Sequence, residues 1–107
     1  MCDICIVVTS CPSEQSALTI ARALVDDRLA ACASLLPGVK SYYYFGGRSH
    51  LEDEVKLLIK TRPELFEGVS MKILELHPYK LPEIVMIGID AASEAFRGWI
   101  ANSVDIR

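Results

Sequence analysis

The sequence predicts one α+β domain, in which an antiparallel sheet carries two long helices on one face. Three observations support this fold class. Strand-like and helix-like apolar patterns follow one another in the order strand, helix, strand, strand, helix, strand and short terminal helix. The length of 107 residues suits a single domain over 1–107. Two of the strands are apolar on both faces, so both sides of the sheet need cover.

Residues 4–10 and 12–30 form the first strand and helix. The strand reads ICIVVTS, which is apolar or small at every position, as is typical of a strand covered on both sides. Ser13 is a good N-cap for the helix, and Glu14 suits its first turn. Helical spacing then places four apolar residues on one side of the helix: Ala17, Ile20, Ala21 and Leu24.

Residues 31–47 and 54–61 form a central hairpin. The pair Pro37-Gly38 interrupts the first of these strands, which predicts a bulge or bend at a sheet edge. Residues 45–48 are expected at the hairpin tip. Apolar and charged residues alternate in the return strand, so Val55, Leu57 and Ile59 share one face.

A second helix follows the hairpin. Thr61 and Glu64 are expected to form a capping box, with Pro63 in the first turn. Pro78 ends this helix because its ring removes a backbone donor. A strand over 83–90 and a short helix over 93–103 complete the chain. The apolar stripes of the two helices are Leu65, Phe66, Val69, Ile73 and Leu76, then Phe96, Trp99 and Ile100.

This βαββαβ order is the ferredoxin-like arrangement, with both long helices on one face of the sheet. The strands over 4–10 and 83–90 are apolar on both faces, yet nothing else in one chain is large enough to cover the second face. The hydrophobic content of 51% and the mean hydropathy of +0.30 agree with a surplus of apolar surface. We therefore expect a homo-oligomer.

The charge and hydropathy of the chain limit which partners and which compartment can be expected. A net charge of −3 gives no electrostatic support for binding a nucleic acid. No apolar stretch approaches the ~18 residues of a membrane span, so no membrane partner is expected. No basic segment precedes the first apolar run, which reads as a strand and not as a signal peptide. A cytoplasmic protein with four reduced cysteines is the simplest expectation.

Three residues are candidate ligands for copper or another divalent cation: His77, Cys11 and Cys32. Cys11 precedes the first helix, whose dipole favours a thiolate and soft-metal ligation, although a simple loop role is the alternative. His77 is either a metal ligand, joined by Glu83 or a cysteine, or a helix-end histidine bonded to backbone carbonyls. The alternative for Cys32 is a buried, inert thiol.

Cys2 and Cys5 have the C-x-x-C spacing of metal and redox sites. An odd separation along a strand sends their side chains to opposite faces, and the sequence has no second C-x-x-C. Small buried hydrophobic side chains are therefore the favoured interpretation of both cysteines.

The remaining polar and aromatic residues favour structural roles. Lys60 and Glu83 are expected to form an ion pair, or to act together in a pocket. The aromatic run 42–45 favours strand pairing and subunit contact over base stacking. Acylphosphatase chemistry needs a glycine-rich loop with an arginine, which is absent after the first strand, and no Ser-His-Asp or Cys-His set can be assembled. We therefore expect no enzyme and no catalytic residues.

Three segments of the chain resemble the CutA family of divalent-cation tolerance proteins: ACASLLPG, LLIKT and HPYKLPE. The resemblance spans essentially the whole chain, in order. It implies a ferredoxin-like subunit in a tight homotrimer, similar in architecture to the PII signalling proteins. It also implies a link to copper tolerance, and copper binding in some members. The cleft at the subunit junction would be formed by Lys60, Tyr79, Pro82, Glu83, Phe45 and Trp99.

The chain departs from the family pattern at three positions. Phe45 stands where members usually have tryptophan, and Thr9 stands where some members have a cysteine proposed as a copper ligand. Leu76 replaces a histidine that precedes His77. The leading hypothesis is a non-enzymatic homotrimer linked to divalent-metal tolerance, with copper bound through His77, Cys11 or both. The alternative is a PII-like signalling module that binds a small molecule in the clefts between subunits.

Overall fold

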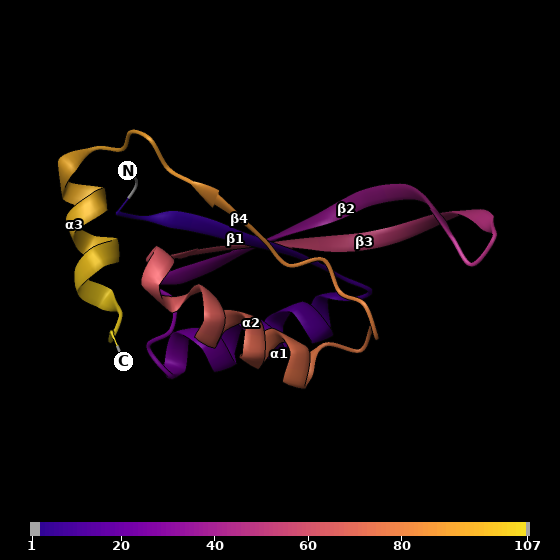
Figure 1. Ribbon diagram of the computed structural model, residues 1–107, viewed down its shortest axis with the longest axis horizontal. Helices are drawn as coiled ribbons and strands as arrows, with labels where there is room; N and C mark the ends of the chain where they lie inside the picture. Colours follow the sequence, from indigo (N-terminus) through magenta and orange to yellow (C-terminus); the bar gives the residue numbers. More distant parts are fainter. Residues whose placement is uncertain (1–2, 107) are drawn as a thin grey trace.

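The structure is a computed structural model that describes residues 3–106. Its elements follow the predicted order (Figure 1). They are β1 (Cys5–Cys11), α1 (Glu14–Asp26), β2 (Cys32–Phe45), β3 (Arg48–Thr61), the 3-10 turn η1 (Pro63–Leu65), α2 (Phe66–Leu76), β4 (Val85–Gly88) and α3 (Glu94–Ser103).

The four strands form one antiparallel sheet in the order β2-β3-β1-β4. Helices α1 and α2 lie side by side on one face of it, and α3 lies at one end (Figure 1). The α+β, ferredoxin-like fold class is therefore confirmed. Strand β4 is shorter than the predicted 83–90, whereas β3 begins at Arg48 and is longer than the predicted 54–61.

The core lies between the sheet and the two long helices. All four predicted apolar residues of α1 are buried, and Ser13 caps this helix by accepting a hydrogen bond from the Ser16 backbone N–H at 3.1 Å. From the sheet, Val7, Leu57 and Ile59 are fully buried against the helices. In α2 the buried residues are Val69 and Ile73, while Leu76 is exposed. The predicted burial of Cys5 is confirmed, and Cys2 lies outside the described residues.

The predicted bulge is present at Pro37-Gly38. Leu36 pairs with Lys56 and Val39 pairs with Glu54, so β2 has one residue more than β3 between these two pairs. Gly38 has a φ of 77°, which glycine adopts without strain. Strand β2 is an edge strand, as expected. Beyond the bulge, β2 and β3 continue as an arm that extends past the helices (Figure 1) and turns at Gly46 and Gly47.

The predicted capping box of the second helix is wrong. Arg62, not Thr61, is the N-cap of η1, and Leu65 is the N-cap of α2. Neither side chain makes a capping hydrogen bond. The buried Thr61 hydroxyl instead donates to the Leu29 carbonyl oxygen at 2.7 Å, and Glu64 pairs with Arg62. The Thr61 hydroxyl therefore bonds to a carbonyl that is distant in the sequence, and it does not cap the helix as the local sequence pattern predicted. Pro63 does begin the first turn, as predicted.

The sheet face opposite α1 and α2 is rich in exposed apolar side chains. Strand pairing places Val8, Leu58 and Val85 on this face, which we call the open face. Val8 is buried and Leu58 is partly buried, while Val85 is exposed. Ile87 and Leu36 also lie on it and are 55% and 52% exposed. The sequence predicted this surplus, because both faces of the strand over 83–90 are apolar.

Candidate functional site

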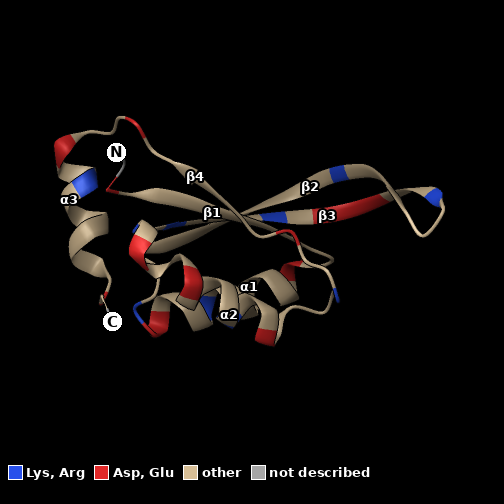
Figure 2. Ribbon diagram, in the orientation of Figure 1, with Lys and Arg blue, Asp and Glu red and all other residues tan. Residues whose placement is uncertain are grey.

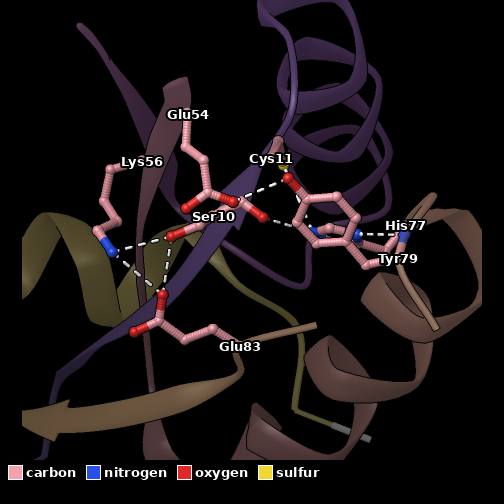
Figure 3. Close-up of polar contacts among 7 residues, drawn as sticks. All are labelled: Ser10, Cys11, Glu54, Lys56, His77, Tyr79 and Glu83. Carbon is pink, nitrogen blue, oxygen red and sulfur yellow. Dashed lines mark hydrogen bonds and ion pairs between the residues drawn. The ribbon is translucent and has the colours of Figure 1, made fainter. Parts of the chain in front are cut away.

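Three segments meet where β1 ends. Ser10 and Cys11 close β1, Glu54 and Lys56 lie on the neighbouring β3, and residues 77–83 follow α2 (Figure 3). Pro78 ends α2 as predicted, because His77 takes extended geometry with φ −74° and ψ 134°. The loop then passes across the end of the sheet and returns to it as β4 (Figure 1).

Both ring nitrogens of His77 have partners in the structure. Nε2 lies 2.8 Å from the Ser10 carbonyl oxygen, which only accepts, so Nε2 carries the proton. Nδ1 accepts a hydrogen bond from the Tyr79 backbone N–H at 3.1 Å. Burial lowers the pKa of His77, while the Ser10 carbonyl and Glu54 oppose this shift. The ring is therefore a neutral imidazole that ties α2 to β1. His77 does lie at the helix end, as the alternative prediction had it, but its carbonyl partner belongs to β1 and not to the last turn of α2.

Cys11 lies at the end of β1 and is fully buried. Its Sγ lies 3.8 Å from Nε2 of His77, so the structure brings together two of the three candidate metal ligands. Burial raises the pKa of the thiol, a hydrogen bond with Ser16 lowers it, and Glu54 raises it further. The expected stabilisation of a thiolate by the α1 dipole is therefore outweighed, and the group is a neutral thiol.

Ser10, Lys56 and Glu83 form a closed polar triangle (Figure 3). The Lys56 ammonium donates to Ser10 Oγ at 2.8 Å and to Glu83 Oε1 at 3.1 Å, and the Ser10 hydroxyl donates to the same carboxylate oxygen at 2.8 Å. The Glu83 ion pair is thus made with Lys56. The predicted Lys60–Glu83 pair is wrong, because the Lys60 ammonium donates to Ser34 Oγ.

Glu54 and Tyr79 form a second polar contact beside this triangle. The Tyr79 hydroxyl donates to Glu54 Oε2 at 2.8 Å. Burial raises the pKa of Tyr79 well above its ordinary value of 10, and Glu54 raises it further, so the phenol stays protonated. The Glu54 residue is only 9% exposed. The carboxylate of a largely buried residue is therefore held by a neutral donor.

A cavity of about 740 Å³ lies between the arm and the 78–83 loop. Both polar groupings form part of its wall, together with the rings of Tyr43 and Phe45 from β2. This size suits a small organic molecule, whose sites are typically ~300–1,000 Å³.

The structure places only some of the predicted cleft residues at this cavity. Phe45, Tyr79 and Glu83 line it, as does loop residue Lys80, but Lys60, Pro82 and Trp99 do not. Trp99 packs beside Phe96 on α3, with ring centroids 5.7 Å apart. The candidate ligand Cys32 pairs with Lys60 on the open face, whereas Cys11 points to the helix side.

Sequence reasoning missed three residues of the site: Ser10, Glu54 and Lys56. Lys56 and Lys60 share one strand face in the sequence, and only the register with β1 and β4 decides which of them meets Glu83. Ser10 lies directly opposite Lys56 in that register. The same alternation of side chains along the strand places Glu54 on the face of Lys56. This alternation is the sequence signal that could have identified Glu54 as a site residue.

The described residues contain no group of three or more His, Cys, Asp or Glu side chains arranged to hold a metal ion. Acidic residues are spread over α1, α2 and the arm, including a run at 52–54 of β3 (Figure 2). Within residues 3–106, every helix is too short or too polar to cross a bilayer.

The chain matches known proteins over nearly its whole length. Residues 5–103 match the family model of the CutA1 divalent ion tolerance protein. The divalent-cation tolerance protein CutA of Thermus thermophilus is 39% identical over 98 residues, which are 92% of this chain and 95% of that protein.

Two solved structures have the same fold. CutA from Xylella fastidiosa superposes with a TM-score of 0.93 and 35% identity, covering 96% of this chain and 99% of the other. A CutA from Archaeoglobus fulgidus, described as a periplasmic divalent cation tolerance protein, gives a TM-score of 0.92 and 30% identity over 95% of this chain and 99% of the other.

Proposed function

The chain belongs to the CutA1 divalent ion tolerance protein family, and from this premise we propose that it acts as a non-enzymatic homotrimer in the tolerance of divalent cations. The observation that carries the assembly is the open face, on which Val85, Ile87 and Leu36 are each more than two-fifths exposed. Burying such a face against further copies of the chain gains ~25 cal/mol for each Å² removed from water. We propose the cytoplasm as the compartment, because Cys11 and Cys32 are free thiols.

The assembly is tested by a charge on the open face. Ile87→Asp is expected to lower the mass seen in sedimentation equilibrium from three chains to one, because a buried carboxylate without a partner is costly. Met71→Asp is the matched control, since Met71 is 70% exposed on α2. A wild-type protein that sediments as a single chain of 11.8 kDa at micromolar concentration contradicts the proposal.

The link to cations is proposed to run through weak binding of copper by Cys11 and His77. Two ligands of one tetrahedral ion, at ~2.3 Å for sulfur and ~2.0 Å for nitrogen, lie about 3.5 Å apart. The observed separation of Sγ and Nε2 is 3.8 Å. Binding must displace the Nε2 proton from the Ser10 carbonyl and deprotonate a thiol whose pKa is raised, which opposes tight binding.

A Cu(I) titration against a competing chelator tests this pair. Cys11→Ser removes the soft donor and is expected to weaken binding by about tenfold or more. Cys32→Ser is the control, because Cys32 lies on the other side of the sheet. Equal affinities of the wild-type protein and Cys11→Ser would show that the copper ligands lie elsewhere.

A second candidate function is the binding of a small organic molecule, as in a PII-like signalling module. The cavity between the arm and the 78–83 loop favours it, because aromatic and charged side chains converge there. Saturating ligand raises the melting temperature of the protein that binds it, so thermal-shift screening tests this function.

A further inference from the structure

The charged groups of the cavity differ in how well they are neutralised. Glu54, Lys56, Lys80 and Glu83 line it. Lys56 and Glu83 neutralise each other at 3.1 Å. Lys80 is exposed, so solvent screens its charge. Glu54 is the charge that is both buried and without a counter-ion.

The surroundings of Glu54 leave one carboxylate oxygen for a ligand. Among residues 3–106, no Lys, Arg or His forms an ion pair with it, and the Tyr79 hydroxyl is its one hydrogen-bond donor. That bond uses Oε2, so Oε1 retains its lone pairs. The Glu54 residue is nine-tenths buried, so solvent and salt screen an ion pair with its carboxylate less than they screen a fully exposed pair.

Three aromatic rings also form part of the cavity wall. Tyr43, Phe45 and Tyr79 line the cavity. Tyr43 stacks on His50 with ring centroids 5.1 Å apart, which fixes its plane. The faces of aromatic rings attract cations by ~0.5–2 kcal/mol each, and they also pack against an apolar body.

We propose that this cavity binds an organic ammonium ion with an aromatic or aliphatic body, whose charged nitrogen pairs with Glu54 Oε1 among the rings of Tyr43, Phe45 and Tyr79. The proposal rests on the second candidate function and names the chemical class of its ligand. An ammonium group needs one carboxylate and ring faces. A divalent metal needs several ligands, and the cavity lining holds only the carboxylates of Glu54 and Glu83, of which Glu83 is paired with Lys56.

The test compares three probes of similar shape by isothermal titration calorimetry on the full chain in its native assembly. They are 2-phenylethylammonium, the neutral 2-phenylethanol and the anionic 3-phenylpropionate. The ammonium probe is expected to bind roughly tenfold or more tightly than the alcohol. Glu54→Gln is expected to abolish this preference, because the amide can still accept from Tyr79 but carries no charge.

Glu52→Gln is the matched control. It makes the same chemical change two residues away on the same face of β3, outside the cavity lining, and is expected to keep the preference within about twofold. Circular dichroism of both variants reports whether they fold. If Glu54→Gln unfolds, Tyr43→Leu replaces it, since this variant removes a ring face while keeping the apolar body and is also expected to weaken binding of the ammonium probe.

Each outcome separates the two proposals. Binding of the alcohol or of 3-phenylpropionate in preference to the ammonium overturns the assignment of an ammonium ligand, while the small-molecule function stands. An ammonium preference that persists in Glu54→Gln also overturns it, because the charge would then lie elsewhere. If none of the three probes binds, the ammonium site is wrong, and the small-molecule function then depends on the wider thermal-shift screen.

Discussion

The imidazole Nε2 of His77 donates to the backbone carbonyl oxygen of Ser10 at 2.8 Å, across 67 positions of sequence. The same ring accepts from the Tyr79 backbone N–H. A single side chain thus holds the end of α2, the start of the 78–83 loop and the last residues of β1 together. The first two predictions follow from this relationship.

His77→Ala is expected to lower the free energy of unfolding by about 1–3 kcal/mol, because it leaves a buried carbonyl and a backbone N–H without their partner. His50→Ala is the control. Its ring also lies 2.8 Å from a carbonyl oxygen, that of Phe45, but on the exposed arm, so a smaller loss is expected. Urea denaturation measures both variants, and equal losses would contradict the structural role of His77.

The stability of the protein is expected to fall as the pH drops below about 6.5, in part through His77. Its pKa is lowered in the folded state, so the unfolded chain binds more protons between the folded and unfolded values. This contribution is fully present above pH 6.5 and is lost as the pH falls through the folded pKa. The difference between the wild-type protein and His77→Gln isolates it, and a difference that stays constant from pH 7.5 to about 5 would show that His77 does not titrate differently on folding.

Cys11 is expected to resist alkylation in the native protein. It is fully buried, and its raised pKa leaves little thiolate at pH 8. Iodoacetamide labelling followed by mass spectrometry of the peptide that contains Cys11 is expected to be slow until urea unfolds the chain. Labelling in native buffer as fast as that of a free cysteine peptide would contradict the packing at the end of β1.

Tyr79 is expected to stay protonated in alkaline solution, because burial and the Glu54 carboxylate raise its pKa. The absorbance of phenolate at 295 nm, followed up to about pH 11, should be the same for the wild-type protein and Tyr79→Phe. A smaller rise in Tyr79→Phe would mean that this phenol ionises with the exposed tyrosines and is not bonded to Glu54.

The Lys56–Glu83 pair is expected to show a coupling energy of about 0.5–1 kcal/mol in a double-mutant cycle with Lys56→Met and Glu83→Gln. Both side chains are partly shielded, at 27% and 40% exposure. The Lys40–Asp53 pair is the control, since its side chains are 68% and 81% exposed, and its coupling is expected near zero. Equal coupling energies in the two pairs would contradict the expectation that partial shielding at the cavity strengthens the Lys56–Glu83 ion pair.

The elements of the fold were predictable because their signals are local. Ser13 marks the start of α1 through the hydrogen bond that its side chain accepts. Pro78 marks the end of α2 and Pro37-Gly38 marks the bulge, each through the conformation that its own backbone prefers. The open face was predictable for a similar reason, since strand alternation is a property of the sequence alone.

The site was less predictable because it depends on register and on distant partners. Glu83 meets Lys56 and not Lys60, since β4 and the loop before it are aligned by β1 and not by any nearby residue. Thr61 resembles a helix cap in sequence, yet its hydroxyl bonds to Leu29, 32 residues away. The same limit applies to Cys11, whose burial at the end of β1 outweighs the nearby helix dipole.

The single extra residue of β2 at Pro37-Gly38 decides which of four consecutive aromatic side chains belong to the cavity. Before the insertion, even-numbered residues of β2 share the face of Lys56, and after it the odd-numbered ones do, which brings Tyr43 and Phe45 inward. If both residues stayed and β2 paired regularly through this point, without a bulge, the parity would reverse and Tyr42 and Tyr44 would take their place. A substitution at Gly38 that abolishes the bulge at constant strand length would therefore exchange the lining of the cavity without altering any residue that touches it.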